Sequence, residues 1–563
     1  MDGSSCVRNR DRSRPILRVK QGEVQGILEE NVFGSHDYYS FKGIPFAAPP
    51  VGPLRFKDPE PPASWEDVRD ASKCGEVSAQ LYPPIPPLQP SLDKVVIGQE
   101  DCLYLNIYVP YNIYTKNGNP VMVWIHGGGY IFGTGNDSQD KPDYLMAKDV
   151  ILVTISYRLG ALGFLNLGHE EASGNQGLKD QVAALKWIKE NIEVFSGDSN
   201  NITVFGVSAG SICTHLLTLS SLSKDLFHKA ILQSGVSTCD WAMMNLPGDN
   251  PTANSFKLAS KLGNDSTDPA TVIKFLREKV SVDEIIQKQY EVLIPEEAFT
   301  RFVPFGPTID DKAKKPFLPR PVSELLDNDN NIPIIVGHTS HEYIFFYTGL
   351  AAAPNALNTW YASLPLLVKN FKKAQGEITD SETINNLTTC VKRRYFNNVT
   401  NFTQKSIPSL IRFLSDEHFT RPIKDFVDRR RKTKQAPTYF YNFSYIGNQM
   451  TLAKAMGNTL TALGASHTDD LAYLFYEPIC KNNDPNGKDP PAIGTNDRKI
   501  LEILTRMWTN FAKTGDPTSV LDKYVTTTWR PATANNFHRL NIGDVTVQLA
   551  HISNCERVEE WEI

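Results

Sequence analysis

The sequence lacks the marks of several large classes of protein. No uninterrupted apolar stretch approaches the roughly 18 residues that a membrane-spanning helix needs, and the apolar runs at 121–125 and 150–155 have the length of buried strands. No basic stripe stands out, and 58 Lys+Arg against 63 Asp+Glu give a net charge of −5, so a dedicated nucleic-acid-binding protein is not expected. Disorder is excluded because 41% of the 563 residues are hydrophobic. A large globular enzyme is the class that remains.

Cysteine is also scarce. No pair has the C-x-x-C spacing of a zinc site, and eight cysteines in 563 residues are too few for a disulfide scaffold. They are Cys6, Cys74, Cys102, Cys213, Cys239, Cys390, Cys480 and Cys555. Structural zinc is therefore not expected.

The first residues, MDGSSCVRNRDRSRP, are charged and have no apolar core, so nothing there resembles a secretory signal. We therefore expect an intracellular, cytoplasmic protein, although an incomplete N-terminus would give the same appearance in a secreted one. Residues 1–18 are expected to form an N-terminal tail. Residues 19–563 are expected to form a single domain because no Gly/Ser-rich or charged linker divides them.

The first half of the chain alternates apolar runs with helical patterns, which predicts an α/β fold with helices on both faces of a sheet. Runs such as NPVMVWIHGGG, DVILVTISY and NITVFGVSAG end in glycine, serine or a polar turn. The segment 177–195 has apolar residues at helical spacing, and a late helix is expected from about Asp497 to Gly515. The segments 240–304 and 350–435 are helical and irregular, so we expect them to be insertions that cap the sheet.

The strongest single motif is the G-x-S-x-G at Gly206 to Gly210. It follows a predicted strand and precedes a predicted helix. A sharp strand-to-helix turn exposes the serine Oγ, and the glycines are needed because a Cβ there would clash with neighbouring chain. This context favours Ser208 as a nucleophile over the alternative of a plain tight turn.

A second motif, His126-Gly127-Gly128-Gly129, also follows an apolar strand. Consecutive glycines let backbone N–H groups point into a cavity, which is what an oxyanion hole requires. The alternatives are a flexible turn or a dinucleotide loop. The nucleotide alternative fails because no G-x-G-x-x-G fits this region and no P-loop lysine follows.

A nucleophilic serine needs a histidine base, and the base needs a carboxylate to orient it. The chain order of serine, acid and histidine confines the base to His418, His467, His538 or His551 if the acid lies near the middle of the chain. Glu342 follows the apolar run IPIIVG, and His467 lies in the turn-like GASHTDDLAYLF. These two are the best placed, although spacing alone leaves surface or helix-capping roles open for both.

The motifs together resemble the type-B carboxylesterase and lipase family, which has the α/β-hydrolase fold and includes liver carboxylesterases, cholinesterases and insect α-esterases. FKGIPFAAPPVGPLRF, EDCLYLNIYVP, HGGGYIFGTG, YRLGALGFL, GNQGLKDQVAALKWIKENI, NITVFGVSAG, PFGPTID and SHTDDLAYLF occur in the family's order. The match runs from about Val19 to Trp561. Without a secretory signal, the chain is most similar to the intracellular insect α-esterases.

The resemblance implies a role for particular residues. It makes Ser208 the nucleophile, Glu342 the acid and His467 the base, with the N–H groups of Gly128, Gly129 and Ala209 as oxyanion donors. It also implies a Cys74–Cys102 disulfide and two structural ion pairs, Arg55 with Glu100 and Arg158 with Asp180. No metal ion or organic cofactor is implied. A mixed, mostly parallel sheet is expected, with an active-site gorge roofed by the helical insertions.

The chain departs from the family pattern where cationic substrates would bind. Val207 stands before the serine, where the family usually has Glu, and Leu92 stands where cholinesterases have a Trp that holds a quaternary ammonium. Acetylcholine is therefore not expected to be a substrate. Juvenile hormone esterases resemble secreted proteins with Gln before the serine, and neither feature is present, which disfavours that activity without excluding it.

These expectations describe a serine carboxylesterase that acts on uncharged hydrophobic esters of xenobiotic, lipid, pheromone or hormone-like kind. Its expected partners are small-molecule esters and organophosphate or carbamate inhibitors, with no nucleic acid and no transmembrane segment. The alternatives are a slow-turnover protein that sequesters esters or organophosphates, and a catalytically silent binding protein. The sequence leaves the natural ester and the choice between monomer and dimer open.

Overall fold

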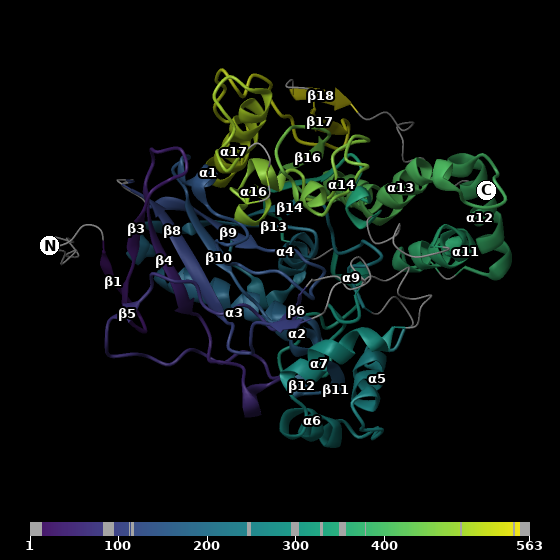
Figure 1. The fold of residues 1–563 in the computed structure, drawn as a ribbon, viewed down its shortest axis with the longest axis horizontal. Coiled ribbons are helices and arrows are strands. Elements are labelled where there is room, and N and C mark those ends of the chain that lie inside the picture. Colours follow the sequence, from purple (N-terminus) through teal and green to yellow (C-terminus); the bar gives the residue numbers. More distant parts are fainter. Residues whose placement is uncertain are drawn as a thin grey trace.

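The computed structural model describes residues 14–82, 95–111, 113, 118–244, 249–293, 303–326, 330–347, 356–377, 379–482, 484, 487–543 and 547–551. Within this part of the chain, the largest feature is an 11-stranded sheet with the order β18-β17-β16-β15-β14-β13-β9-β10-β8-β4-β3 (Figure 1). The strands are β3 (Ile27–Glu29), β4 (Tyr38–Pro45), β8 (Tyr104–Pro110), β9 (Asn119–Ile125), β10 (Ile151–Ile155), β13 (Gly197–Val207), β14 (Lys229–Gln233), β15 (Ile334–Thr339), β16 (Thr438–Phe443), β17 (His538–Ile542) and β18 (Val547–His551).

The centre of the sheet is parallel. From β10 through β9, β13, β14, β15 and β16 to β17, each strand runs parallel to its neighbour. The edges are antiparallel: β8, β4 and β3 on one side, and β18 on the other. The predicted mixed, mostly parallel sheet is therefore confirmed, and the carboxyl ends of its central strands share one edge.

The central strands are apolar along their whole length because both faces of the sheet are covered. In β9, the side chains of Val121, Val123 and Ile125 join one core, while Met122 and Trp124 join the other. This alternation follows from the two-residue period of a strand.

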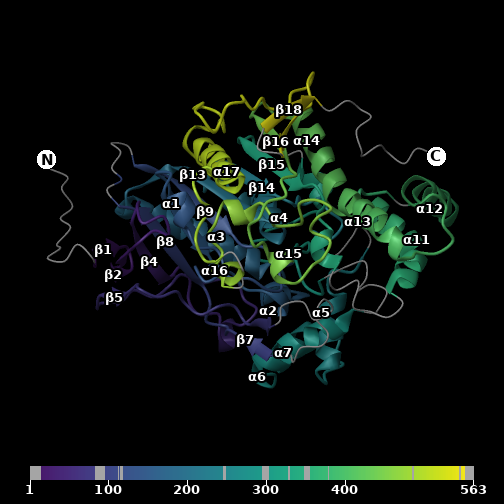
Figure 2. The same ribbon diagram turned by 45° about the horizontal axis from the view of Figure 1, so that its top comes forward.

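Helices cover the two faces of the sheet (Figures 1 and 2). The first core contains the apolar sides of α3 and α4, and the second contains those of α1 and α17. The helices are α1 (Asp143–Met146), α2 (Gly160–Phe164), α3 (Gln176–Asn191), α4 (Ala209–Leu219), α5 (Ala253–Lys261), α6 (Pro269–Glu278), α7 (Val282–Lys288), α9 (Val322–Leu325), α11 (Ala356–Ala374), α12 (Ser381–Phe396), α13 (Ile407–Ser415), α14 (Arg421–Thr433), α15 (Leu452–Ala455), α16 (Pro478–Lys481) and α17 (Asn496–Thr514).

The predicted helical insertions form two groups. In both views α5, α6 and α7 lie together on one side of the sheet, and α11, α12 and α13 lie together on another (Figures 1 and 2). Their apolar side chains join the first core. The predicted late helix is α17, which ends before Gly515, a residue whose φ of 83° closes the helix in the left-handed region.

Short strands lie outside the large sheet. They are β1 (Ile16–Val19), β2 (Gly22–Gln25), β5 (Arg69–Asp70), β6 (Gln80–Tyr82), β7 (Val95–Ile97), β11 (Asn166–His169) and β12 (Ala172–Ser173). Strand β1 pairs with β2, so residues 16–18 of the expected tail belong to a small sheet, and residues 1–13 lie outside the described residues. In the described part, none of the helices combines the length and the apolar character that crossing a membrane would require.

Candidate active site

The predicted nucleophile and acid follow two strands of the parallel centre. Ser208 comes directly after β13, and Glu342 comes three residues after β15. Strand β14 lies between them: the N–H of Ser208 donates to the carbonyl oxygen of Gln233 (2.8 Å), and the N–H of Ser234 donates to that of Gly337 (2.9 Å). Both candidate residues therefore lie at the carboxyl edge of the sheet, where open α/β folds hold their sites.

Ser208 forms the sharp turn between β13 and α4. Its φ of 58° and ψ of −125° lie in a strained region for a residue with a side chain. A Cβ on Gly206 would lie 2.6 Å from the carbonyl oxygen of Ile125, and a Cβ on Gly210 would lie 2.1 Å from the same oxygen. Both glycines are therefore required by close backbone contact. The serine is 9% exposed, at the N-terminus of a helix whose dipole favours negative charge.

The turn after β9 packs against this serine. A Cβ on Gly127 would lie 3.2 Å from the Cβ of Ser208. Gly128 and Gly129 have φ values of 107° and 58°, and a Cβ on Gly128 would lie 2.0 Å from the carbonyl oxygen of Phe132. The N–H groups of these two glycines donate to no described residue. They are free to bind an oxyanion near the serine.

His126 supports the glycine turn rather than the chemistry. Its Nδ1–H donates to the carbonyl oxygen of Gly127 (2.8 Å), and its ring stacks on Tyr157 with centroids 4.5 Å apart. Burial lowers the pKa of His126 to about 4, so the imidazole is neutral near pH 7. The hydroxyl of Tyr157 donates to the carbonyl oxygen of His126 (3.1 Å), which further fixes the turn.

Glu342 and His467 form a buried pair. The Nδ1 of His467 lies 2.5 Å from Oε2 of Glu342. His467 is 2% exposed and Glu342 is 0% exposed. The other carboxylate oxygen accepts the N–H of Thr339 (2.7 Å). Because an ionised carboxylate can only accept, the proton lies on Nδ1 in the neutral imidazole, and Nε2 carries a lone pair.

The surroundings keep Glu342 ionised. Burial by itself would raise the pKa of this carboxyl group, but the charge and hydrogen bond of His467 oppose it, together with the hydrogen bond from the N–H of Thr339. The pKa of Glu342 is held below its usual value. The group is therefore a carboxylate at neutral pH.

Three phenylalanine rings surround the imidazole of His467. Phe345, Phe346 and Phe419 have ring centroids 5.8, 5.7 and 5.1 Å from it. The Nε2 of His467 is buried and makes no hydrogen bond to any described residue. Hydrogen bonds between a catalytic base and its nucleophile are often long before substrate binds and tighten in the complex.

The other histidines that chain order left open have different surroundings. His418 pairs with Asp240 through Nδ1 and Oδ1 (2.8 Å). His538 begins β17, where it pairs with His551 of β18 at the outer edge of the sheet. The side chain of His551 lies outside the described residues. His467 contacts Glu342, as described above.

Sequence reasoning missed a buried network beside this pair. The Nε2–H of Gln233 and the hydroxyl of Tyr441 donate to Oδ2 of Asp470 (2.8 and 3.1 Å), and the Nε1–H of Trp508 donates to Oε1 of Gln233 (3.2 Å). Burial raises the pKa of Asp470 to about 6. The network joins the His467 turn to β14, and its only sequence signal was the adjacent acids of SHTDD.

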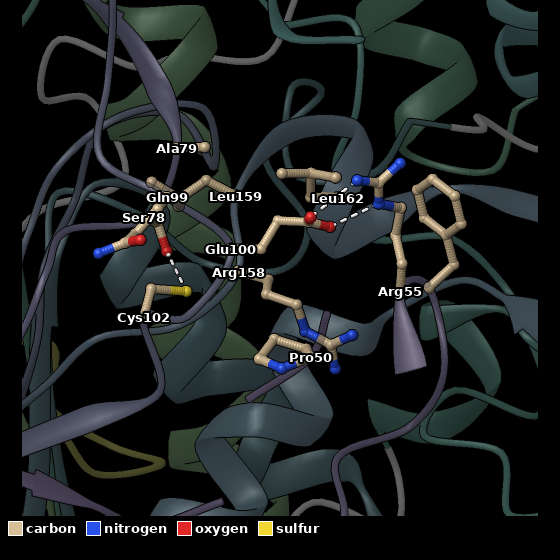
Figure 3. A pocket seen from close by; sticks show the side chains of 11 residues that line it. Pro50, Arg55, Ser78, Ala79, Gln99, Glu100, Cys102, Arg158, Leu159 and Leu162 are labelled. Atoms are coloured by element: carbon tan, nitrogen blue, oxygen red, sulfur yellow. Dashed lines mark hydrogen bonds and ion pairs between the residues drawn. The ribbon is translucent and has the colours of Figure 1, made fainter. Parts of the chain in front are cut away.

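Both structural ion pairs implied by the resemblance are present. The guanidinium of Arg55 contacts both carboxylate oxygens of Glu100 (2.6 and 2.8 Å; Figure 3), and that of Arg158 contacts both oxygens of Asp180 (2.8 and 2.7 Å). Arg55, Glu100 and Arg158 help to line a cavity of about 10 Å³, which has space for about one water molecule. None of its lining residues is a predicted catalytic residue.

The expected Cys74–Cys102 disulfide is not present, and both residues are free thiols. The Sγ of Cys74 donates to Oδ1 of Asp137 (3.5 Å), whereas that of Cys102 lies 3.0 Å from the hydroxyl of Ser78 (Figure 3). Each sulfur thus has its own polar neighbour. Burial raises the pKa of each thiol to about 12, so both stay protonated at neutral pH.

Some expectations fall on parts of the chain that the structure leaves undescribed. Cys6, Cys555 and Leu92 lie outside the described residues. Within the described ranges, no three His, Cys, Asp or Glu side chains gather in a group that could hold a metal ion.

Comparison with known proteins agrees with this architecture. The model of the carboxylesterase family matches residues 13–561. The chain is 36% identical over 528 residues to juvenile hormone esterase of Tribolium castaneum, covering 90% of this chain and 84% of the relative, and 32% identical over 534 residues to esterase E4 of Myzus persicae, covering 92% and 89%. The crystal structure of juvenile hormone esterase from Manduca sexta, with OTFP covalently attached, superposes with a TM-score of 0.82 at 27% identity and covers 97% of each chain.

The sheet order, the strained serine turn and the structural match define an α/β-hydrolase. The chain belongs to the carboxylesterase family. The family and its insect esterase relatives support ester hydrolysis as the general reaction.

Proposed function

We propose that this protein hydrolyses carboxylic esters through a covalent acyl-enzyme, with Ser208 as nucleophile, His467 as base and Glu342 as the acid that orients the base. The observation that carries the proposal is the 2.5 Å contact between Glu342 and His467, at the sheet edge that also holds the strained Ser208. A neutral imidazole whose Nδ1–H is held by a carboxylate presents a basic Nε2.

In the proposed reaction, the Nε2 of His467 takes the proton of the Ser208 hydroxyl as Oγ attacks the ester carbonyl carbon. The tetrahedral intermediate collapses, the bond to the alcohol oxygen breaks, and the alcohol leaves with the proton from His467. Water then attacks the acyl-enzyme, and His467 again takes the proton and returns it to Ser208 as the acid is released. Glu342 remains ionised and stabilises the imidazolium at each stage.

The oxyanion of each tetrahedral intermediate is assigned to the N–H groups of Gly128, Gly129 and Ala209. The first two donate to no described residue, and Ala209 is the first residue of α4, where backbone N–H groups have no partner within the helix. Such donors act where charge develops in the transition state, and loss of one lowers kcat by about 100- to 1000-fold.

The substrates proposed are uncharged, hydrophobic carboxyl esters. The rings beside His467 are phenylalanines, and Val207, which precedes the nucleophile, is 3% exposed within the apolar core. The three rings offer apolar contact to a hydrophobic ester, and Val207 brings no charge next to the nucleophile. Covalent attachment of OTFP to the Manduca sexta relative supports a covalent route in this chain.

A stopped-flow assay with p-nitrophenyl butyrate tests the proposal, with the wild type beside Ser208→Ala. We expect a burst of about one equivalent of p-nitrophenol followed by steady turnover in the wild type, and neither in the variant. A burst with very slow turnover would instead indicate a protein that sequesters esters. An equal rate in both proteins would refute the role of Ser208.

Organophosphates offer a second test of the nucleophile. A fluorophosphonate should phosphonylate Ser208, with loss of fluoride, and intact-mass spectrometry should record one adduct in the wild type and none in Ser208→Ala. If the wild type stays unmodified as well, the serine is not reactive, and a silent binding protein becomes the better account.

A further inference from the structure

A second buried histidine–carboxylate pair lies next to the aromatic residues that surround His467. The Nδ1 of His418 is 2.8 Å from Oδ1 of Asp240, and the two side chains are 0% and 4% exposed. The residues are 178 positions apart in the sequence. Asp240 lies in the segment that follows β14, and His418 lies in a π-helical turn, Asp416–Thr420, between α13 and α14. The pair therefore joins two segments that are far apart in the chain.

Each member of the pair is followed by an aromatic residue. These two residues form what we call the aromatic wall: Trp241 contacts Phe419, and Phe419 contacts His467. Trp241 follows Asp240, Phe419 follows His418, and their ring centroids are 5.3 Å apart. The ring of Phe419 in turn lies 5.1 Å from that of His467. The Nε1–H of Trp241 donates to the carbonyl oxygen of His418 (3.0 Å), which couples the wall to the pair a second time.

The pair also adjoins the acid of the candidate triad. The ring of Tyr343, which directly follows Glu342, stacks on His418 with centroids 5.4 Å apart and planes at 16°. Phe371 of α11 covers another side of His418 with an edge-on contact (4.9 Å). His418 is thus packed between the segment of the acid and one of the helical insertions.

A π-helical turn is rare because its backbone geometry is less favourable than that of an α-helix, and such turns occur often at functional sites. Tertiary contacts must therefore hold this one in place. A buried carboxylate without a hydrogen-bonding partner is strongly destabilising, so Asp240 fixes the position of the imidazole it contacts. Phe419 is part of this turn and contacts His467, so fixing the turn also restricts the movement of the Phe419 ring.

We propose that Asp240 and His418 are positioning residues which hold Trp241 against Phe419 and Phe419 against His467, and thereby limit the size of the acyl group that the site accepts. The proposal rests on the ester hydrolysis proposed above. Neither residue of the pair reacts with substrate; the pair acts through the two aromatic rings. Loss of the pair lets the aromatic wall move. The kcat/KM for esters with a large acyl group then rises relative to that for esters with a small one.

The test compares kcat/KM for p-nitrophenyl octanoate with that for p-nitrophenyl acetate. In Asp240→Ala, we expect the octanoate-to-acetate ratio to rise about fivefold or more, chiefly through KM for octanoate. Asp240→Asn keeps an oxygen that accepts the Nδ1–H, so its ratio should stay close to that of the wild type. The control is Asp143→Ala, which removes another fully buried carboxylate, on α1, and should destabilise the protein without changing the ratio.

Phe419→Leu provides a test that leaves the buried pair intact. Like Asp240→Ala, it should raise the octanoate-to-acetate ratio of kcat/KM. In the double variant, the ratio should rise by less than the product of the two single increases, because both substitutions act on the same aromatic wall. An unchanged ratio in Phe419→Leu, or a ratio in Asp240→Ala that equals that of Asp143→Ala, would overturn the proposal. Absence of hydrolysis in the wild type would instead reject the proposed function itself.

Discussion

Glu342→Gln separates the charge of the acid from its shape. The glutamine can keep an oxygen toward the N–H of Thr339, as Oε1 of Glu342 does now at 2.7 Å. Its amide NH₂ then faces Nδ1 of His467, where two donors cannot meet, so the imidazole moves its proton to Nε2. The base is lost although the fold is kept. The corresponding change in a serine protease lowers kcat about 10⁴-fold, so we expect kcat/KM to fall by about 10³- to 10⁴-fold, equivalent to about 4–5.5 kcal/mol.

The assay is steady-state hydrolysis of p-nitrophenyl butyrate, accompanied by thermal unfolding of each variant. Asp143→Asn is the matched control because it exchanges another fully buried carboxylate for an amide on α1. It should keep kcat/KM within about twofold of the wild type. The exchange lies outside the candidate site and removes no interaction that is made in the transition state. If Glu342→Gln keeps more than a tenth of the wild-type kcat/KM while remaining folded, the contact between Glu342 and His467 does not orient a catalytic base.

The remaining predictions concern stability. Arg158→Met leaves the carboxylate of Asp180 buried without its partner and should lower the free energy of unfolding, measured in urea, by about 3–5 kcal/mol. Adding Asp180→Leu should recover part of that loss. An unchanged free energy of unfolding in Arg158→Met would contradict a stabilising pair. Burial raises the pKa of Asp140 in the folded protein to about 6, above the 3.8 of the unfolded chain. The folded state therefore binds the Asp140 proton more tightly, and the stability that this provides is complete below pH 3.8 and is lost as pH rises through 6. Asp140→Asn should therefore stabilise the protein by about 1 kcal/mol more at pH 8 than at pH 5, and an equal effect at both would refute the raised pKa. Because Cys74 and Cys102 are free thiols, dithiothreitol should leave the melting temperature unchanged, and both residues should react with iodoacetamide in urea without prior reduction; protection of both would indicate a disulfide.

The elements that the sequence predicted best have strong local signals. Strand β9 and helix α3 follow directly from apolar residues at periods of two and about 3.6, because each element must bury a face or a stripe. The predicted helix at 177–195 ends as an α-helix at Asn191 and continues as a 3₁₀ turn over Ile192–Phe195, a difference that periodicity does not resolve.

Local sequence was less informative about which distant groups meet. The Cys74–Cys102 bond came from resemblance alone, and the structure gives each thiol a separate polar neighbour. The Asp240–His418 pair had no sequence signal, because its members are 178 positions apart and neither lies in a motif. Side-chain contacts at such separation depend on how the helical insertions return to the sheet.

By itself, the sequence determined the order of strands and helices in the central fold, the serine turn and the glycine turn. These depend on residues that are neighbours in the chain, where backbone sterics and apolar periodicity act directly. The tertiary structure decided that Glu342, rather than another carboxylate, contacts His467, that Asp240 rather than Glu342 contacts His418, and that phenylalanines surround the candidate base. Parallel strands bring their carboxyl ends to one edge whatever their separation in the chain, so residues hundreds of positions apart become neighbours only when the sheet forms.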